Sequence, residues 1–245
     1  MISLAFPNKR PAFPKPGKNF HTLASLLALL LFLPFAVTSI QNGPFSPLYS
    51  VFGLTRDGLL NHRNIWQLFT HPLFHGGWIH LLTNIAFIYY FGGRLQHIFG
   101  EKEVWRVAII SLLLGSTFHL TLHPSSGPLV GASGIGFGFF FALTTVSPES
   151  RLFPFGLRAV NVRNGVALSA LLLLLLNPSL GIPGLSSIGT LISKSGGAAL
   201  FQMGHAYHLG GGIAGWLAVR KYLRKPITLA QLQQQRAASE DDEAA

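Results

Sequence analysis

The sequence contains no cysteine, which excludes disulfide bonds and metal sites built on thiolates. Charge is also scarce: Asp, Glu, Lys and Arg make up 11 % of the 245 residues, against roughly 25 % in a soluble domain. Hydrophobic residues reach 49 %, which excludes a disordered chain and argues against a freely soluble enzyme. The net charge of +10 would suit a nucleic-acid binder, but the basic residues form short clusters between long apolar runs. We therefore expect an integral membrane protein that binds no nucleic acid.

The first apolar run covers residues 22–40 and follows a polar, basic segment at 1–20. A basic segment before an apolar core also describes a signal peptide. The run is close to the roughly 20 residues that cross a bilayer, and this favours a membrane anchor.

Five further apolar runs predict five more spanning helices. They lie at 78–91, 104–122, 131–146, 166–176 and 198–219. The connection at 41–76 contains no span, and the glycine-rich stretch 177–197 is expected to be a loop. Pro226 ends the last helix and begins a tail at 226–245. The expected fold class is thus all-α, a six-helix membrane bundle over residues 21–225.

The distribution of basic residues predicts the orientation of this bundle. With six spans and a cytoplasmic N-terminus, the outer segments hold three of the 18 Lys and Arg residues: Arg56, Arg63 and Lys194. The other 15 (18 − 3) then lie in cytoplasmic segments, as the preference of basic residues for that side requires. Both termini are therefore expected in the cytoplasm.

Polar residues inside spans are costly and are functional candidates by default. Three clusters qualify, and all fall at the outer ends of predicted spans. They are His80-Leu-Leu-Thr-Asn84, Gly131-Ala-Ser133-Gly134, and His205-Ala-Tyr-His208 followed by glycines that include Gly211 and Gly215.

Ser133 on its own is more typical of helix packing, because small residues let membrane helices approach closely. The combination changes this interpretation. Glycines on the fourth and sixth spans would allow a Ser133–His208 hydrogen bond of roughly 3 Å, and serine needs such a base to become a nucleophile. Asp57 is the one acidic residue expected outside the cytoplasm, so we predict a Ser–His dyad. His80, Asn84 and the Ser133 backbone N–H are candidate donors to an oxyanion.

These residues resemble the motifs of the rhomboid intramembrane serine proteases in their basic six-span bacterial form. The resemblance covers about residues 60–222. The matching motifs are His71-x3-His75-x4-His80-x3-Asn84, Tyr90-Phe-Gly-Gly93, Gly131-x-Ser133-Gly134 and His208-x2-Gly211-x3-Gly215.

The resemblance implies a role for each matched residue. Ser133 would be the nucleophile and His208 the base, with His80 and Asn84 in the oxyanion hole and Phe137 packed on the catalytic histidine. Gly131, Gly134, Gly211 and Gly215 would support the site, and His205 would be a bystander. The resemblance further implies transmembrane protein substrates cleaved near the outer leaflet of a bacterial inner membrane, with no metal and no cofactor.

Two positions depart from the family pattern. The first outer loop usually carries Trp-Arg, and this sequence has Trp66-Gln67. A glutamate that braces this loop usually follows the Gly-Gly of the second span, and this sequence has Gln96. A neutral amide forms a weaker bond than a charged group, so this loop is expected to be braced less strongly, while the catalytic chemistry is retained.

Two other functions fit parts of the pattern. Histidines spaced three or four apart, such as His71 and His75, suggest a histidine-box membrane metalloenzyme, although no adjacent His-His pair and no His-Glu-x-x-His occurs. A catalytically inactive relative that binds membrane clients is the second alternative, favoured by Gln67 and Gln96. A transporter would require an inverted repeat or an intramembrane acid, and neither is visible.

Overall fold

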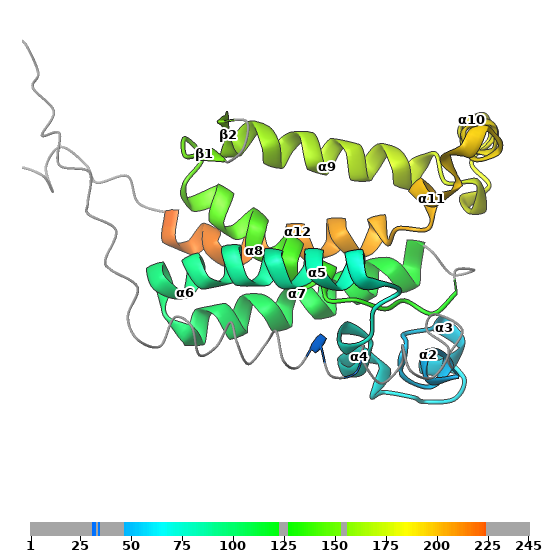
Figure 1. Cartoon of the computed structure of the whole chain (residues 1–245), viewed down its shortest axis with the longest axis horizontal. Coiled ribbons are helices and arrows are strands. Elements are labelled where there is room, and N and C mark those ends of the chain that lie inside the picture. The colour runs from blue at the N-terminus through cyan, green and yellow to red at the C-terminus, as the bar shows by residue number, and fades with distance from the viewer. Residues whose placement is uncertain (1–30, 33, 35–46, 123–126, 153–155, 224–245) are drawn as a thin grey trace, which may run out of the picture.

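The computed structural model of the protein describes residues 31–32, 34, 47–122, 127–152 and 156–223. Apart from Leu31, Phe32 and Pro34, the predicted first span at 22–40 lies outside these ranges. So do the expected cytoplasmic segments at 1–20 and 226–245. Within the described part the protein is mostly helical (Figure 1).

Five long helical segments form the bundle in the described part of the chain. They are the continuous run α5 (Trp78–Phe87), η3 (Ile88–Gly92) and α6 (Gly93–Phe99), then α7 (Glu101–Leu122), α8 (Ser133–Val146), α9 (Ala159–Leu175) and α12 (His205–Arg220). The segment η3 is a π-helical turn. A short antiparallel pair, β1 (Arg151–Leu152) and β2 (Leu157–Arg158), joins α8 to α9.

One of these helices, α7, is long and apolar enough to cross a membrane by itself, and α8 and α9 are apolar but shorter. Large apolar side chains on the outer surface of the bundle are exposed, among them Ile79, Ile109 and Leu168. Exposed apolar side chains on so many helix positions are unusual for a soluble protein, whereas a bilayer accepts them. The described helices therefore have the surface of a membrane bundle.

The core lies where α12 packs against α7 and α8. Phe139, Phe140 and Phe141 of α8 are buried together with Val104 and Val107 of α7. Near the C-terminal end of α12, the Arg106 guanidinium pairs with Glu103 and donates a hydrogen bond of 2.6 Å to the Ala218 carbonyl. This contact fixes the N-terminal part of α7 to α12.

From residue 47, where its description begins, the connection before α5 contains short helices and no span, in agreement with the sequence prediction for this stretch. These are α2 (Leu48–Phe52), α3 (Arg56–Leu60), α4 (Gln67–Thr70) and the 3₁₀ turn η2 (His71–Leu73). They gather at the end of the bundle where α5 begins and α7 ends (Figure 1).

Three boundaries differ from the sequence prediction. The run expected at 78–91 continues to Phe99, and the helix expected at 166–176 begins at Ala159. In both cases polar residues such as Arg94 and Arg163 interrupt the apolar pattern without ending the helix. The run expected at 198–219 is divided into α11 (Ala198–Phe201) and α12, because Gln202, Met203 and Gly204 are not helical.

The stretch expected to be a loop at 177–197 is largely helical, which corrects the sequence prediction. It contains η4 (Pro178–Leu180), α10 (Leu185–Ile192) and the π-helical turn η5 (Ser193–Gly197). Its glycines end and redirect short helices: Gly181, Gly184 and Gly196 all have positive φ, a conformation that glycine adopts without strain.

Candidate active site

Ser133 and His208 lie within hydrogen-bond distance of each other although 75 residues separate them in the sequence. Ser133 is the first residue of α8, and His208 lies in the first turn of α12. The His208 Nε2 is 2.8 Å from the Ser133 Oγ. His208 is buried and Ser133 is half-buried. The structure therefore brings together the two residues that the sequence pairs as nucleophile and base.

Ser133 lies inside the bundle rather than at its end. The 14 residues of α8 extend about 21 Å and the 22 residues of α7 about 33 Å, at 1.5 Å per residue. An extended segment at 127–132 covers the part of the bundle that the shorter α8 leaves, because it returns into the bundle before α8 begins (Figure 1). The hydroxyl is thus set back from the end of the bundle by that extended segment.

The Phe137 ring fixes the orientation of the His208 ring. The two rings are stacked with centroids 4.2 Å apart and planes 5° from parallel. Phe137 lies one turn after Ser133 on α8, so the same helix presents the hydroxyl and the aromatic ring to the imidazole. The sequence-based expectation for Phe137 agrees with this geometry.

Glycines bring α8 and α12 close enough for the Ser133–His208 contact. A Cβ at Gly211 would lie 2.2 Å from the Gly134 carbonyl oxygen, and a Cβ at Gly215 would lie 2.0 Å from the Gly138 carbonyl oxygen. Neither distance permits a side chain, and the neighbour is backbone in both cases. The two helices therefore meet at van der Waals distance along this glycine face.

Tyr207 fills the space between α7 and α8, a role that sequence analysis missed. Its fully buried ring occupies the positions that side chains at Gly115 and Gly134 would need. It also packs edge-on against His71, with centroids 5.4 Å apart. The one sequence signal for this role was its position next to His208. Adjacent residues of a helix point in different directions, so Tyr207 had to contact other residues than His208 does.

His80 and Asn84 lie against the backbone just before Ser133. A Cβ at Gly131 would be 2.5 Å from His80 Nε2 and 3.3 Å from Asn84 Nδ2, and Gly131 has a φ of +109°. Asn84 Nδ2 is buried and makes no hydrogen bond to the described residues. His80 Nδ1 accepts a long bond of 3.4 Å from the Gly76 N–H, so the neutral ring carries its proton on Nε2. Two side-chain donors therefore converge beside Ser133.

The Ser133 backbone adds a third donor. It is the first residue of α8, so its N–H has no acceptor within the helix. The Gly136 N–H donates to the Ala132 carbonyl, which begins the hydrogen bonding of the helix after Ser133. The N-terminus of α8 also carries the positive end of the helix dipole, which favours an anion at this position.

Backbone bonds from the preceding connection hold residues 129–131 in place. Leu54 and Leu129 exchange two hydrogen bonds of 2.9 Å, and the Gly131 N–H donates to the His71 carbonyl at 2.9 Å. Burial lowers the pKa of His71 to about 4, so the ring is neutral at pH 7 and its Nδ1–H donates to the Gln67 carbonyl at 2.8 Å. No sequence motif marks Leu54, because it contributes only its backbone.

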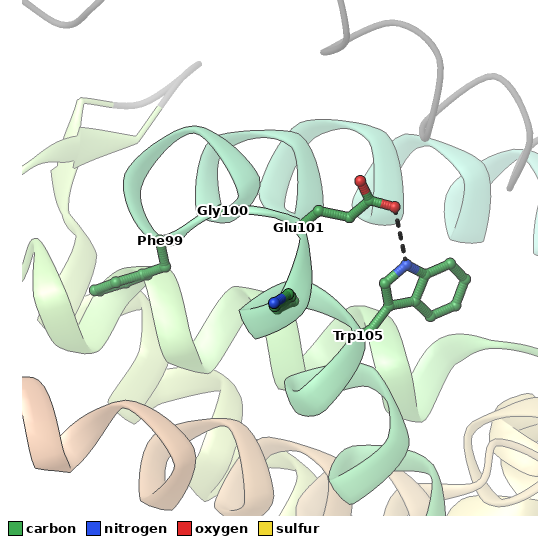
Figure 2. Close-up of a pocket in the computed structure, with 5 residues that line it drawn as sticks. Phe99, Gly100, Glu101 and Trp105 are labelled. Carbon is green, nitrogen blue, oxygen red and sulfur yellow. Dashed lines mark hydrogen bonds between the residues drawn. The ribbon is translucent and has the colours of Figure 1, made fainter.

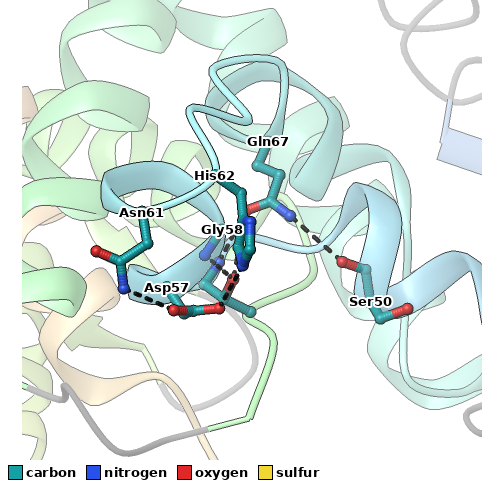
Figure 3. Close-up of polar contacts among 7 residues, drawn as sticks. Ser50, Asp57, Gly58, Asn61, His62 and Gln67 are labelled. Carbon is teal, nitrogen blue, oxygen red and sulfur yellow. Dashed lines mark hydrogen bonds and ion pairs between the residues drawn. The ribbon is translucent and has the colours of Figure 1, made fainter.

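Gln67 braces this connection as a neutral residue (Figure 3). Its buried side chain accepts a hydrogen bond from the Thr55 N–H at 3.2 Å and donates to the carbonyls of Ser50 and Val51, both at 3.3 Å. The adjacent Gly58 leaves the room that the amide occupies, because a Cβ there would lie 2.5 Å from Gln67 Oε1. The amide thus links α2, α3 and α4.

The structure places residue 96, where the family usually has a glutamate, too far from this loop to brace it. Gln96 lies on α6, 18 residues after Trp78, so about 27 Å of helix separates it from the start of α5. Figure 1 shows α6 and α4 at opposite ends of the bundle. Replacing the family glutamate by Gln96 therefore leaves the connection before α5 unaffected.

Two further histidines lie beside those of the site: the His75 ring is 5.1 Å from that of His80, and His205 precedes His208 by one turn. His205 Nε2 lies 2.6 Å from the Leu200 carbonyl oxygen, and its ring is 6.1 Å from that of His208. Within the described ranges no group of three or more His, Asp or Glu side chains is placed to hold a metal ion.

A hollow of about 470 Å³ lies at the other end of the bundle (Figure 2). Phe99, Glu101 and Trp105 line it, and the Trp105 Nε1–H donates to Glu101 at 3.3 Å. It is formed where α6 passes into α7, and none of its lining residues belongs to the Ser133 site. It is therefore separate from the candidate active site.

The fold and the site define a class of protein: a membrane helix bundle with a hydrogen-bonded Ser–His pair beside converging hydrogen-bond donors. The rhomboid domain family matches residues 62–225, about two thirds of the chain. The protein therefore belongs to the rhomboid family.

Curated relatives are similar over about half of the chain or less. RHOMBOID-like protein 7 of Arabidopsis thaliana is 30 % identical over 52 % of this chain and 41 % of its own length. Rhomboid protease GlpG of Enterobacter sp. (strain 638) is 31 % identical over 37 % of this chain and 33 % of its own. Inactive RHOMBOID-like protein 8 of Arabidopsis thaliana is 25 % identical over 50 % and 35 %. The matched region thus spans less than half the length of these relatives.

Proposed function

We propose that the protein is an intramembrane serine endopeptidase that cleaves transmembrane protein substrates by a Ser133–His208 dyad. The observation that carries this proposal is the 2.8 Å contact between His208 Nε2 and Ser133 Oγ, made inside a membrane bundle. A serine hydroxyl needs a base at this distance to act as a nucleophile.

The geometry supports a two-step acyl transfer. His208 Nε2 removes the Ser133 hydroxyl proton as Oγ attacks the substrate carbonyl, and the C–N bond breaks when the same imidazole returns the proton to the leaving amine. Water then attacks the ester, giving its proton to His208, and Ser133 is released with its proton restored. Both tetrahedral intermediates place negative charge on the former carbonyl oxygen, where donors stabilise it. Asn84 Nδ2, His80 Nε2 and the Ser133 N–H are the candidate donors.

Among the described residues no carboxylate contacts His208, and the Phe137 ring supplies part of the orienting function. Stacking at 4.2 Å restricts rotation of the imidazole plane about the His208 Cβ–Cγ bond, so that Nε2 stays directed at Ser133. Precise orientation of a base accounts for much of its effect.

The recessed position of Ser133 supports a membrane-embedded substrate. A helical substrate hydrogen-bonds its own carbonyls, so the scissile peptide must leave the helical conformation before Oγ can attack. We accordingly propose substrates whose transmembrane helices unwind easily near the outer leaflet.

The proposal includes six spans, cytoplasmic termini and a site near the outer surface. The excess of basic residues in the expected cytoplasmic segments supports this orientation. A bacterial rhomboid protease is among the similar proteins, which supports the basic bacterial type and an inner-membrane location.

The decisive experiment compares cleavage of a model transmembrane substrate in detergent. Ser133→Ala and His208→Ala should each abolish cleavage, and the double variant should be no worse, because the two residues act as one unit. His205→Ala is the matched control: it removes a buried histidine of the same helix that contacts the Leu200 carbonyl, and it should retain most activity. Cleavage by Ser133→Ala protein would refute the proposal.

A catalytically inactive, client-binding rhomboid is the second candidate function. Similarity to Inactive RHOMBOID-like protein 8 and the neutral Gln67 favour it. A fluorophosphonate probe separates the two, since it labels an activated serine without any substrate. Labelling that requires both Ser133 and His208 supports the protease, whereas an unlabelled, folded protein supports client binding.

A further inference from the structure

The helix α10 lies across the bundle at the end nearest the candidate active site. It follows α9 through η4 and precedes α11, which leads into His205. Figure 1 looks nearly along the axis of α10 while α9 runs across the view. If α9 crosses a bilayer, α10 therefore lies near the plane of the membrane surface, as interfacial helices do.

Helix α10 exposes large apolar residues on the side away from the protein. On the side toward α9, Ser186 Oγ donates to the Asn177 carbonyl at 3.4 Å, a Cβ at Gly189 would lie 1.7 Å from the Leu176 carbonyl oxygen, and Leu185 and Ile192 are half-buried. On the outer side, Ile188 is 49 % and Leu191 66 % exposed. These two residues are three apart and share one helix face. A surface helix in water directs its apolar residues toward the protein instead.

The exposed apolar face of α10 continues the lipid-facing surface of α9. Leu168, Leu171 and Leu172 are exposed along α9, and the chain turns at Asn177 directly into η4 and α10. Lys194 follows Leu191 by three residues and is exposed, so its long side chain can reach phosphate headgroups while the apolar residues enter the acyl region. This continuity indicates lipid rather than a second protein as the occupant.

Binding of α10 to lipid would also help to position α11, which precedes the helix that carries His208. Asn177 Nδ2 donates to the Phe201 carbonyl at 3.3 Å, and His205 contacts the Leu200 carbonyl. The carbonyls at the end of α11 are therefore held by Asn177, just after α9, and by the first turn of the helix that carries His208.

We infer that α10 is an interfacial anchor whose Ile188–Leu191 face binds the phospholipid surface on the Ser133 side of the membrane. This inference uses the membrane placement of α9 and is independent of proteolytic activity.

The absence of cysteine allows a direct test with single-cysteine variants. Leu191→Cys is labelled with an environment-sensitive fluorophore in the full-length protein, reconstituted into phosphatidylethanolamine–phosphatidylglycerol vesicles. Quenching is measured with aqueous iodide and with lipids that carry a nitroxide near the headgroup. Leu171→Cys on α9 is the lipid-exposed control, and His62→Cys in the connection before α5 is the water-exposed control.

The inference predicts that the Leu191 label is quenched by the shallow nitroxide and is several-fold less sensitive to iodide than the His62 label. Iodide quenching equal to that at His62 would overturn it. Protection from both quenchers would also overturn it, since that result shows protein covering the face. Leu191 is largely exposed, so the substitution removes little packing, and Ile188→Cys repeats the measurement on the same face. A cleavage assay on the labelled proteins reports separately on the proposed protease.

Discussion

The contact between α8 and α12 can be tested by adding one methyl group. In Gly215→Ala the new Cβ would lie 2.0 Å from the Gly138 carbonyl oxygen, whereas a carbon–oxygen contact needs about 3.3 Å. The helices must therefore separate by about 1.3 Å at this level. If α12 moves as a unit, the Ser133–His208 distance of 2.8 Å grows to about 4 Å, beyond hydrogen-bond range. Overpacking of this kind costs about 1–3 kcal/mol of folding free energy.

Gly215 lies seven residues, about 10 Å, from His208 along α12, so its substitution acts on the dyad through helix separation alone. We expect Gly215→Ala to lower the melting temperature and to reduce cleavage together. Gly211→Ala, with its Cβ 2.2 Å from the Gly134 carbonyl oxygen and closer to His208, should reduce cleavage further.

Gly165→Ala is the matched control, because it is the same substitution in a helix with no atom near the new Cβ. It should leave cleavage unchanged and raise stability by up to about 1 kcal/mol through helix propensity. The measurements are thermal unfolding in detergent and cleavage of a model transmembrane substrate. A Gly215→Ala protein with wild-type melting and wild-type cleavage would refute the close-approach argument.

Two further predictions concern the oxyanion donors and the topology. Asn84→Ala should lower kcat by up to about 100- to 1000-fold with little change in KM, because this donor acts mainly on the transition state. An increase in KM with unchanged kcat would instead assign Asn84 to substrate binding. Reporter fusions at residues 50 and 240 should report opposite sides of the membrane, and a result that places both on one side would contradict the proposed position of Ser133.

The arrangement of the described helices was largely predictable from hydropathy. The runs at 104–122 and 131–146 agree with α7 and α8 within three residues. The start of α9 was missed because Asn161, Arg163 and Asn164 interrupt the apolar run, although charged residues at a span end can lie among headgroups. Helix α10 was missed because it is short and lies between glycines such as Gly184 and Gly196, while only the fold shows that Ser186 and Gly189 face α9.

The positions of Ser133 and His208 followed from motif spacing, and the glycine pattern indicated that their helices meet. What holds the backbone before Ser133 could not be predicted in the same way. Leu54 and the His71 carbonyl hold residues 129–131 through backbone bonds, and a backbone bond leaves no trace in residue type. Tyr207 was missed for a related reason, since its function is to fill space beside Gly115 and Gly134.

These contacts show how Ser133 and His208 are held against each other by groups other than a carboxylate in the described part of the chain. Ser133 is fixed from one side by backbone bonds to the connection before α5, and His208 is fixed from the other by Phe137 stacking and by glycine contact with α8. Each constraint comes from steric fit or from neutral hydrogen bonds. A buried carboxylate inside a bilayer would add a desolvation cost that these constraints avoid. Close glycine packing and aromatic stacking are therefore the arrangement that suits a Ser–His dyad to a membrane interior.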